Sequence, residues 1–128
     1  MEVVDYYLYT KEHEWVSIED NIATIGITEY AQEALGDITF VELPEVGAEV
    51  EQFEEFAAIE SVKAANDIFA PVSGKVIEVN TRLESDPGLI NKSAFEKGWI
   101  AKVQMSDKEE ASNLMTAEEY QKFLESID

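Results

Sequence analysis

Residues 56–74 read F-A-A-I-E-S-V-K-A-A-N-D-I-F-A-P-V-S-G, and this stretch decides the fold. Two apolar runs, F-A-A-I-E-S-V (56–62) and A-N-D-I-F-A (65–70), flank Lys63. β-Branched and aromatic residues on both sides of a short break are typical of a β-hairpin. P-V-S-G (71–74) then predicts a turn. The sequence therefore predicts a hairpin around residues 56–74 with Lys63 at its tip.

Five more segments have the short or alternating apolar patterns of β-strands. They are H-E-W-V-S-I (13–18), I-A-T-I-G-I (22–27), I-T-F-V-E-L (38–43), K-V-I-E-V (75–79) and G-W-I-A-K-V-Q (98–104). The first two surround a polar turn at residues 19–21 and predict a second hairpin. Trp15 and Trp99 fall within strand patterns, so we expect both rings to anchor the core.

A short helix is predicted at T-E-Y-A-Q-E-A-L-G (28–36). Thr28 can cap its first amides, and Gly36 can adopt the left-handed conformation that ends it. We expect its inward-facing side chains to be Tyr30, Ala34 and Leu35. Residues 81–90, which contain the turn D-P-G, predict a further short helical excursion.

The C-terminus predicts a longer helix, at about residues 116–127. Thr116 and Glu119 have the spacing of a capping box, in which each side chain accepts a hydrogen bond from the other residue's amide. An apolar stripe follows at helical spacing, consisting of Tyr120, Phe123, Leu124 and Ile127. Ser106 and Glu109 repeat the capping signal before it. The whole pattern predicts a mainly β sandwich or barrel hybrid of short strands with peripheral helices.

Composition narrows the function classes. The chain has 128 residues, 45% of them hydrophobic, which suits one domain spanning residues 1–128. Nine Lys and Arg against 28 Asp and Glu give a net charge of −19, so the surface repels the phosphates of nucleic acid and of anionic membranes. There is no Cys, so thiol chemistry would need a cofactor that supplies the sulfur.

The acidic charge has two interpretations: it attracts basic protein partners, or it only keeps an abundant protein soluble and monomeric. No apolar run approaches the roughly 18 residues of a membrane span, and the acidic N-terminus resembles neither a signal peptide nor an Arg-rich transit peptide. We therefore expect a cytoplasmic protein of the bacterial type, although a mature organelle protein would look the same. His13 is the only His, so we expect a structural role and no metal site, with Glu12 and Glu14 raising its pKa.

A Lys at the tip of a hairpin is by default a solvated residue. Val62 and Ala64 are uncharged, so neither neighbour pairs with the Lys63 ammonium. Glu60 is expected on the opposite face of the strand, where it can contact a modifying enzyme. These residues suit a tether for an acyl group, and they leave the identity of that group open.

Six blocks in order along the chain resemble the H-protein family of the glycine cleavage system. They are Y-T-K-E-H-E-W-V (9–16), G-I-T-E-Y-A-Q-E-A-L-G-D (26–37), F-V-E-L-P-E-V-G (40–47), E-S-V-K-A (60–64), A-P-V-S-G (70–74) and G-W (98–99). The resemblance implies a lipoyl-domain-like barrel-sandwich hybrid, mainly β, with short antiparallel strands and peripheral helices that include a C-terminal one.

The resemblance also implies a function and a site. Lys63 would carry lipoate through an amide, and lipoate-attaching enzymes would recognise the hairpin surface made by Glu60, Ser61, Val62 and Ala64. The chain would then be a carrier and no enzyme. It would take the aminomethyl group of glycine from the PLP-dependent P protein to the folate-dependent T protein, and the flavin-dependent L protein would reoxidise the dithiol.

Three carboxylates are candidates for a cleft that shelters the loaded arm: Glu12, Glu14 and Asp67. A protonated aminomethyl group is cationic, so a nearby carboxylate can hold it and keep water away. The simpler interpretation of the same residues is a solvated acidic face.

Two departures from the family pattern concern loops. E-Q-F-E (51–54) stands where a Gly is usual near the tip of the turn, so we expect Phe53 to distort that turn or to expose its ring. S-A-F (93–95) stands where the family often has Pro followed by Tyr.

Other functions compete with the carrier of glycine cleavage. A lipoyl domain of a 2-oxoacid dehydrogenase usually has Asp before the Lys, and a biotin carrier favours Met on both sides, so Val62 and Ala64 disfavour both. A lipoyl relay protein, which donates its lipoate to other enzymes, would use the same hairpin and remains an alternative. A self-sufficient enzyme is disfavoured, because nothing organises the carboxylates with a nucleophile or a base.

Overall fold

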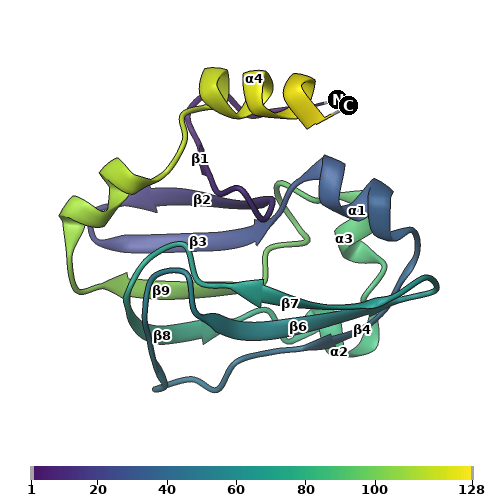
Figure 1. The fold of residues 1–128 in the computed structure, drawn as a ribbon. Helices are drawn as coiled ribbons and strands as arrows, with labels where there is room; N and C mark the ends of the chain where they lie inside the picture. The colour runs from purple at the N-terminus through teal and green to yellow at the C-terminus, as the bar shows by residue number, and fades with distance from the viewer. Residues whose placement is uncertain (1, 128) are drawn as a thin grey trace.

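The short apolar segments form two antiparallel sheets (Figure 1). The computed structural model describes residues 2–127. The larger sheet has six strands in the order β1-β2-β3-β9-β8-β5. Their bounds are β1 Leu8–Tyr9, β2 Glu14–Glu19, β3 Ile22–Ile27, β9 Ala101–Met105, β8 Gly74–Val79 and β5 Glu49–Val50. The expected hairpin of β2 and β3 is confirmed, with a two-residue turn in which Asp20 has a positive φ of 50°.

The smaller sheet contains the hairpin with which the sequence analysis began. Its order is β4-β6-β7, with bounds β4 Ile38–Glu42, β6 Glu55–Ser61 and β7 Ala65–Phe69. In the hairpin Ile59 pairs with Asn66 and Glu60 pairs with Ala65. This register leaves Val62, Lys63 and Ala64 as the connection between the two strands.

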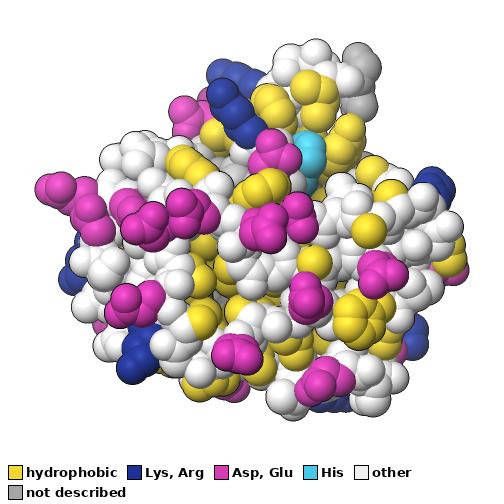
Figure 2. All heavy atoms as spheres, turned by 60° about the horizontal axis from the view of Figure 1, so that its bottom comes forward, with side chains coloured by type: hydrophobic (Ala, Val, Ile, Leu, Met, Phe, Trp, Pro, Cys, Tyr) yellow, Lys and Arg dark blue, Asp and Glu magenta, His cyan; other side chains and the backbone are white. Residues whose placement is uncertain are grey.

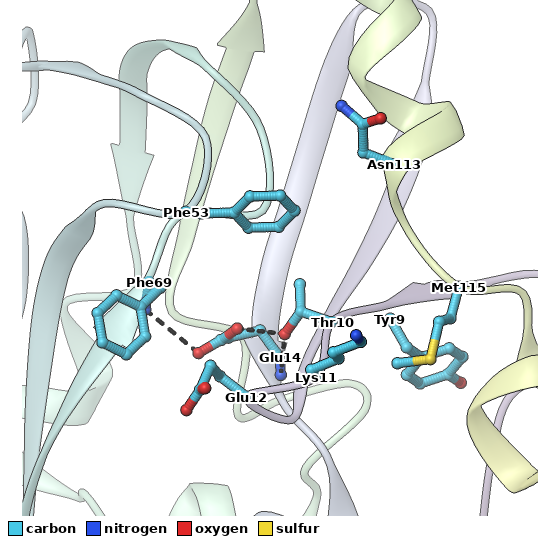
Figure 3. A pocket seen from close by; sticks show the side chains of 9 residues that line it. All are labelled: Tyr9, Thr10, Lys11, Glu12, Glu14, Phe53, Phe69, Asn113 and Met115. Carbon is cyan, nitrogen blue, oxygen red and sulfur yellow. Dashed lines mark hydrogen bonds between the residues drawn. The ribbon is translucent and has the colours of Figure 1, made fainter. Parts of the chain in front are cut away.

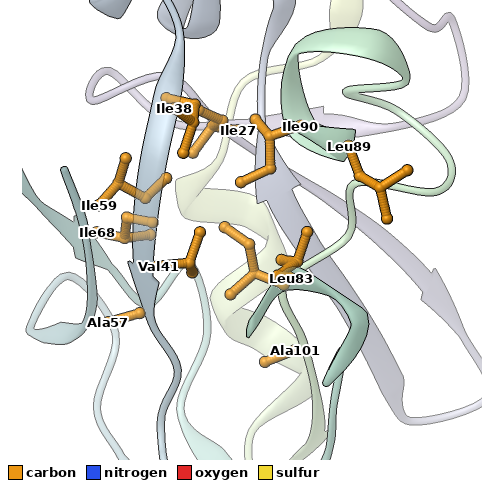
Figure 4. Close-up of a cluster of buried hydrophobic side chains, with 11 residues drawn as sticks. Ile27, Ile38, Val41, Ala57, Ile59, Ile68, Leu83, Leu89, Ile90 and Ala101 are labelled. Carbon is orange, nitrogen blue, oxygen red and sulfur yellow. The ribbon is translucent and has the colours of Figure 1, made fainter. Parts of the chain in front are cut away.

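The two sheets meet over a shared apolar core (Figure 4). On β6 the buried residues Ala57 and Ile59 alternate, as the two-residue period of a strand requires, whereas on β4 a register shift between Ile38 and Phe40 separates the buried Ile38 and Val41 by three residues. The buried side chains of this cluster include Ile27, Ile38, Val41, Ile59, Ile68, Leu83 and Ile90. A second cluster lies along the larger sheet and includes Val16, Ile25, Val72 and Val103. The mainly β fold expected from the sequence is confirmed.

Helices close the ends of the sandwich. Their bounds are α1 Glu29–Leu35, α2 Arg82–Ser85, α3 Leu89–Lys92, the 3-10 helix η1 Lys108–Asn113 and α4 Ala117–Ile127. Thr28 caps α1 by accepting a hydrogen bond from the amide of Ala31, and Gly36 ends it with φ 79°, both as expected. The segment predicted at 81–90 forms two short helices, α2 and α3.

The capping box of α4 is confirmed at its two hydrogen bonds. The Thr116 amide donates to Glu119 Oε1 at 2.9 Å, and the Glu119 amide donates to Thr116 Oγ1 at 3.2 Å. The second capping prediction is wrong by one residue, because Asp107, and not Ser106, accepts from the Glu109 amide at the start of η1.

Three side chains lie elsewhere than the sequence pattern predicted. Ala34 is exposed on α1, where Ala31 packs on the core in its place. Ile127 is 44% exposed at the end of the α4 stripe, which therefore buries only its first turns. Trp99 precedes β9 and is half-buried beside Lys102, whereas Trp15 is a buried anchor as expected.

The C-terminal helix α4 contacts the residues just before β2 and just after β3, at the open end of the β2–β3 hairpin. The Tyr120 hydroxyl lies 2.8 Å from His13 Nδ1 and 2.8 Å from the hydroxyl of Thr28, the residue that caps α1. The Tyr120 ring also stacks on Tyr9, with centroids 4.6 Å apart. Through these contacts α4 fixes the segment that leads into β2. Among residues 2–127, no helix has the length and apolar character needed to cross a membrane.

Candidate functional site

The tip of the β6–β7 hairpin is an ordered turn built around Ser61. Its hydroxyl oxygen accepts hydrogen bonds from the amides of Lys63 and Ala64, both at 3.1 Å. The Ser61 amide in turn donates to the Ala64 carbonyl at 2.8 Å. A serine hydroxyl that binds the following amides in this way stabilises a tight turn. Lys63 is therefore presented from a defined backbone.

The Lys63 side chain leaves the tip across the end of α1. A Cβ atom at Gly36 would lie 3.6 Å from Lys63 Cε and 3.4 Å from Val62 Cγ2. The Val62 amide donates to the Asp37 carbonyl at 3.1 Å, which ties the tip to the residues after α1. The two distances from Gly36 are ordinary van der Waals distances, so the aliphatic stem of Lys63 lies against Gly36, and it is the positive φ of 79° that favours glycine there; the residue Lys63 is exposed.

The other residues expected at the hairpin surround Lys63 as an exposed surface. Val62 is 66% exposed, which is unusual for an apolar side chain, and Glu60 and Ala64 are exposed as well. The Glu60 carbonyl accepts a hydrogen bond from the Thr39 hydroxyl at 3.2 Å, so this part of β6 is held to β4. An enzyme that approaches the tip would meet these residues first.

The three candidate carboxylates for an arm-sheltering cleft line one small cavity, which we call the arm cavity. Its volume is about 160 Å³, and it lies between the start of β2, the strand β7 and one face of α1. Glu12, Glu14 and Asp67 supply its carboxylates. Its apolar lining includes Ile27, Ala31, Leu35, Ile59 and Ile68. A cavity lined by both apolar side chains and carboxylates can hold an aliphatic group with a cationic end.

Glu14 differs from the other two carboxylates because it is buried, with 2% of its surface exposed. Its Oε1 accepts a short hydrogen bond from the Thr10 hydroxyl, and its Oε2 accepts one from the Phe69 amide at 3.2 Å. Burial raises the pKa of Glu14 to about 7. The two hydrogen bonds lower the pKa, but the effect of burial is larger. Glu14 is therefore a carboxyl group that changes its charge near neutral pH.

His13 is a structural residue, as expected, but its pKa shifts in the opposite direction to the one predicted. Its Nδ1 binds the Tyr120 hydroxyl, and its ring packs on Tyr30 with centroids 4.5 Å apart. Burial lowers the pKa of His13, and this effect outweighs the attraction of Glu12. The ring is therefore neutral at pH 7 and does not supply a cation to the arm cavity.

The surface around the site is acidic and short of compensating cations (Figure 2). Within residues 2–127, the ion pairs closer than 4 Å are Lys102 with Glu78 and Lys122 with Glu118, both remote in sequence from Lys63. The Asp67 carboxylate also raises the pKa of the exposed Glu55 on β6. The same described residues hold no group of three or more side chains suited to a metal ion.

Comparisons with known proteins agree with this geometry. The family model described as "Glycine cleavage H-protein" matches residues 7–127. The chain is 56% identical to the glycine cleavage system H protein of Thermotoga maritima over 115 residues, which cover 90% of this chain and 93% of that protein. The chain belongs to the glycine cleavage H-protein family.

Two further relatives extend the comparison to a plant protein and to a crystal structure. The mitochondrial glycine cleavage system H protein 2 of Arabidopsis thaliana is 55% identical over 120 residues, covering 94% of this chain and 77% of that protein. The crystal structure of an H protein from Mycobacterium marinum superposes with a TM-score of 0.86 at 38% identity, covering 94% of this chain and 98% of that chain.

Membership of the H-protein family fixes the general role of the chain. It is a lipoylated carrier of the aminomethyl group and a non-catalytic component of the glycine cleavage system. The system implies P, T and L proteins as its partners. The site fits lipoate, because an exposed Lys stands on an ordered turn beside an apolar cavity, and a chain without Cys needs a cofactor to supply a dithiol.

Several residues of this H-protein site have no clear signal in the sequence. Thr10 and the Phe69 amide hold Glu14, Gly36 lies beneath the Lys63 stem, and Tyr120 joins His13 to Thr28. Apart from the bond between Thr10 and Glu14, which are four residues apart, each contact joins residues that are distant in sequence. The positive φ of Phe53, 67°, is the exception, since the unusual residue in the turn pointed to it.

Proposed function

We propose that Lys63 is the residue that carries lipoate, through an amide with its ε-amino group. The observation that carries this assignment is the ordered tip, where Ser61 binds the amides of Lys63 and Ala64 and leaves the amine exposed. Bound in this way, lipoate would supply the dithiol that receives and releases the aminomethyl group. The chain itself presents, positions and protects the arm.

The same proposal gives the exposed tip a second task. Glu60, Val62 and Ala64, on the turn stabilised by Ser61, form the surface that a lipoate-attaching enzyme recognises. Their exposure and fixed backbone support this assignment, because a preorganised epitope costs less entropy to bind than a mobile one. Residues 1–128 then act as one lipoyl-carrier domain, and the strongly acidic surface favours a monomer.

Mass mapping tests the attachment directly. The protein is produced in a host that lipoylates its own carriers, and the intact mass and the proteolytic peptides are measured. We expect an increment of one lipoyl group per chain, carried entirely by the peptide that contains Lys63. An increment on any of the other lysines, or none in a competent host, contradicts the proposal.

We also propose that the arm cavity shelters the loaded arm. Its apolar lining suits the aliphatic part of the arm, and Glu14 and Asp67 lie where a cationic amine needs a counter-charge. Glu12 stands at the exposed side of the same cavity. Held there, the aminomethyl group is screened from water until the carrier meets T protein.

Replacing Glu14 by Gln and Asp67 by Asn tests the shelter. Each change removes a negative charge at nearly constant shape, so we expect the isolated loaded protein to release ammonia faster, by about tenfold in the double variant, since about 1.4 kcal/mol of lost stabilisation corresponds to a factor of ten. The measurement is the rate of ammonia release without T protein. Glu84→Gln, at an exposed position on α2, is the matched control. An unchanged rate in the double variant rules the shelter out and leaves the attachment at Lys63 untouched.

The expected cytoplasmic location stays a prediction for this chain. The name of the Arabidopsis relative places that protein in mitochondria, so the family is found in more than one compartment. Fractionation of the source cells, followed by immunodetection, decides between the two locations.

A further inference from the structure

A second, larger cavity is also lined by Glu14 (Figure 3). Its volume is about 420 Å³, and we call it the Phe53 cavity. Its apolar walls come from Phe53, Phe69, Met115 and Tyr9. Glu12 and Glu14 line both this cavity and the arm cavity.

The wall formed by Phe53 is held in place. Phe53 has φ 67° and is 51% exposed, which confirms both expectations for this turn. Its amide donates to the Ala70 carbonyl at 2.6 Å. Next to it, the Gln52 amide donates to Ser73 Oγ at 2.8 Å, and Gln52 Nε2 donates to the carbonyls of Pro71 and Glu110. These bonds hold the turn, and with it the half-exposed ring at the cavity.

Among the residues that line the Phe53 cavity, Glu14 is a buried carboxyl group without an ion-pair partner within 4 Å in the described part of the chain. The side chain is buried and held by Thr10 and the Phe69 amide, and no Lys or Arg among residues 2–127 lies within 4 Å of it. Lys11 lies at the exposed side of the cavity without pairing with Glu14. When Glu14 ionises, its charge therefore has hydrogen-bond donors but no ion-pair partner within 4 Å among residues 2–127, and Lys11 is a cation in the lining of the same, largely apolar cavity. Such a charge gains strongly from a cation that enters the cavity.

We propose that the Phe53 cavity receives a lysine side chain of T protein, whose ammonium reaches Glu14 while its methylene stem lies between Phe53, Phe69 and Met115. An apolar stem with a charged end matches apolar walls with a carboxyl floor. An ammonium needs a single acceptor, whereas the fork of an arginine approaches both carboxylate oxygens, to which Thr10 and the Phe69 amide already donate. The net charge of −19 attracts a basic partner surface.

This assignment gives docking a mechanical consequence. The amine of the loaded arm, in the arm cavity, and the ammonium of the partner, in the Phe53 cavity, compete for the same Glu14. A docked lysine therefore weakens the hold on the arm at the moment when T protein is in place to receive it. This release step rests on the proposed shelter, whereas the occupation of the Phe53 cavity does not.

The first experiment tests the cavity alone. The full-length lipoylated protein with its arm oxidised, which carries no amine, is titrated with n-butylammonium chloride at constant ionic strength and followed by amide NMR shifts. We expect saturable shifts at residues 9–14, 53, 69 and 115, and about tenfold weaker binding, or none, for Glu14→Gln and for Phe53→Gly. Gly is well suited to the positive φ at position 53, so this variant keeps the turn.

The matched control is Phe40→Ala, because Phe40 is 52% exposed, much like Phe53, but lies on β4 outside both cavities. We expect it to bind n-butylammonium like the wild type. Equal binding by the neutral probe 1-butanol, or wild-type binding by Glu14→Gln, overturns the lysine assignment. Either result leaves the shelter proposal standing, because that proposal is tested by ammonia release.

The second experiment tests the partner. Aminomethyl transfer from the loaded carrier to T protein is measured for the wild type, Phe53→Gly and Phe40→Ala. We expect Phe53→Gly to raise the KM for the carrier about tenfold, while ammonia release in the absence of T protein stays unchanged. A KM equal to that of the wild type and of Phe40→Ala shows that T protein places no lysine in this cavity.

Discussion

Replacing Lys63 by Arg is expected to reduce glycine cleavage by the reconstituted P, T and L proteins to the background measured without carrier. Arg keeps a positive charge and a long stem over Gly36, but its guanidinium stays protonated and is not acylated. Lys63 is exposed, so the change should alter the free energy of unfolding by less than about 0.5 kcal/mol. The measurements are glycine-dependent NADH formation, the intact mass and a urea unfolding curve.

The control for this experiment is Lys102→Arg, which changes another lysine in the same way. Lys102 lies on β9, pairs with Glu78 and is remote from the hairpin. We expect the control to keep both the lipoyl increment and full activity. A Lys63→Arg protein that still gains the increment, or still supports cleavage above background, would show that the arm is attached elsewhere.

Glu14→Gln is expected to change the pH dependence of stability by roughly 3 kcal/mol between pH 5 and pH 8. The pKa of Glu14 is about 7 in the folded protein, against an ordinary value of 4.5 in the unfolded chain. Between these values the folded state binds a proton that the unfolded state has lost, so the free energy of unfolding of the wild type falls as pH rises. Each pH unit in this window costs about 1.4 kcal/mol, and the loss ends above pH 7.

The Gln variant does not titrate at this position, so its free energy of unfolding does not fall in this way as pH rises. Its free energy of unfolding, relative to the wild type, should therefore rise from pH 5 to pH 8. Urea unfolding at both pH values measures the difference, and Glu84→Gln, exposed on α2, should show no comparable change. A constant difference between Glu14→Gln and wild type would mean that Glu14 is ionised at pH 5 despite its burial.

Sequence patterns predicted the parts of this protein that depend on neighbours along the chain. The cap at Thr28, the stop at Gly36 and the capping box of α4 are local hydrogen-bond patterns, and each forms as expected. Asp107 displaced the predicted cap at Ser106 because two adjacent residues both had a suitable side chain. Local signals thus identify the elements and leave their ends uncertain by a residue.

The electrostatics of the site depend on contacts that no local pattern contains. Glu12 and Glu14 flank His13 in sequence, which predicted a raised pKa, but packing by Tyr30 and Tyr120 buries the ring and lowers it. Glu14 was a candidate carboxylate from the start, yet its burial follows from the approach of β7 and its Phe69 amide. The burial of His13 and Glu14, and the pKa shifts that follow from it, can be seen only in the three-dimensional arrangement of the two sheets and helices.

The contacts of Tyr120 with His13 and Thr28 determine which parts of the site can form first while the chain is being synthesised. The hairpin that carries Lys63 is complete by residue 74, in the middle of the chain. The contacts that fix the segment before β2, with Glu12 and Glu14 on either side of His13, need α4, which follows the hairpin along the chain and is therefore synthesised after it. An unfinished chain therefore has its attachment point before it has the shelter beside it.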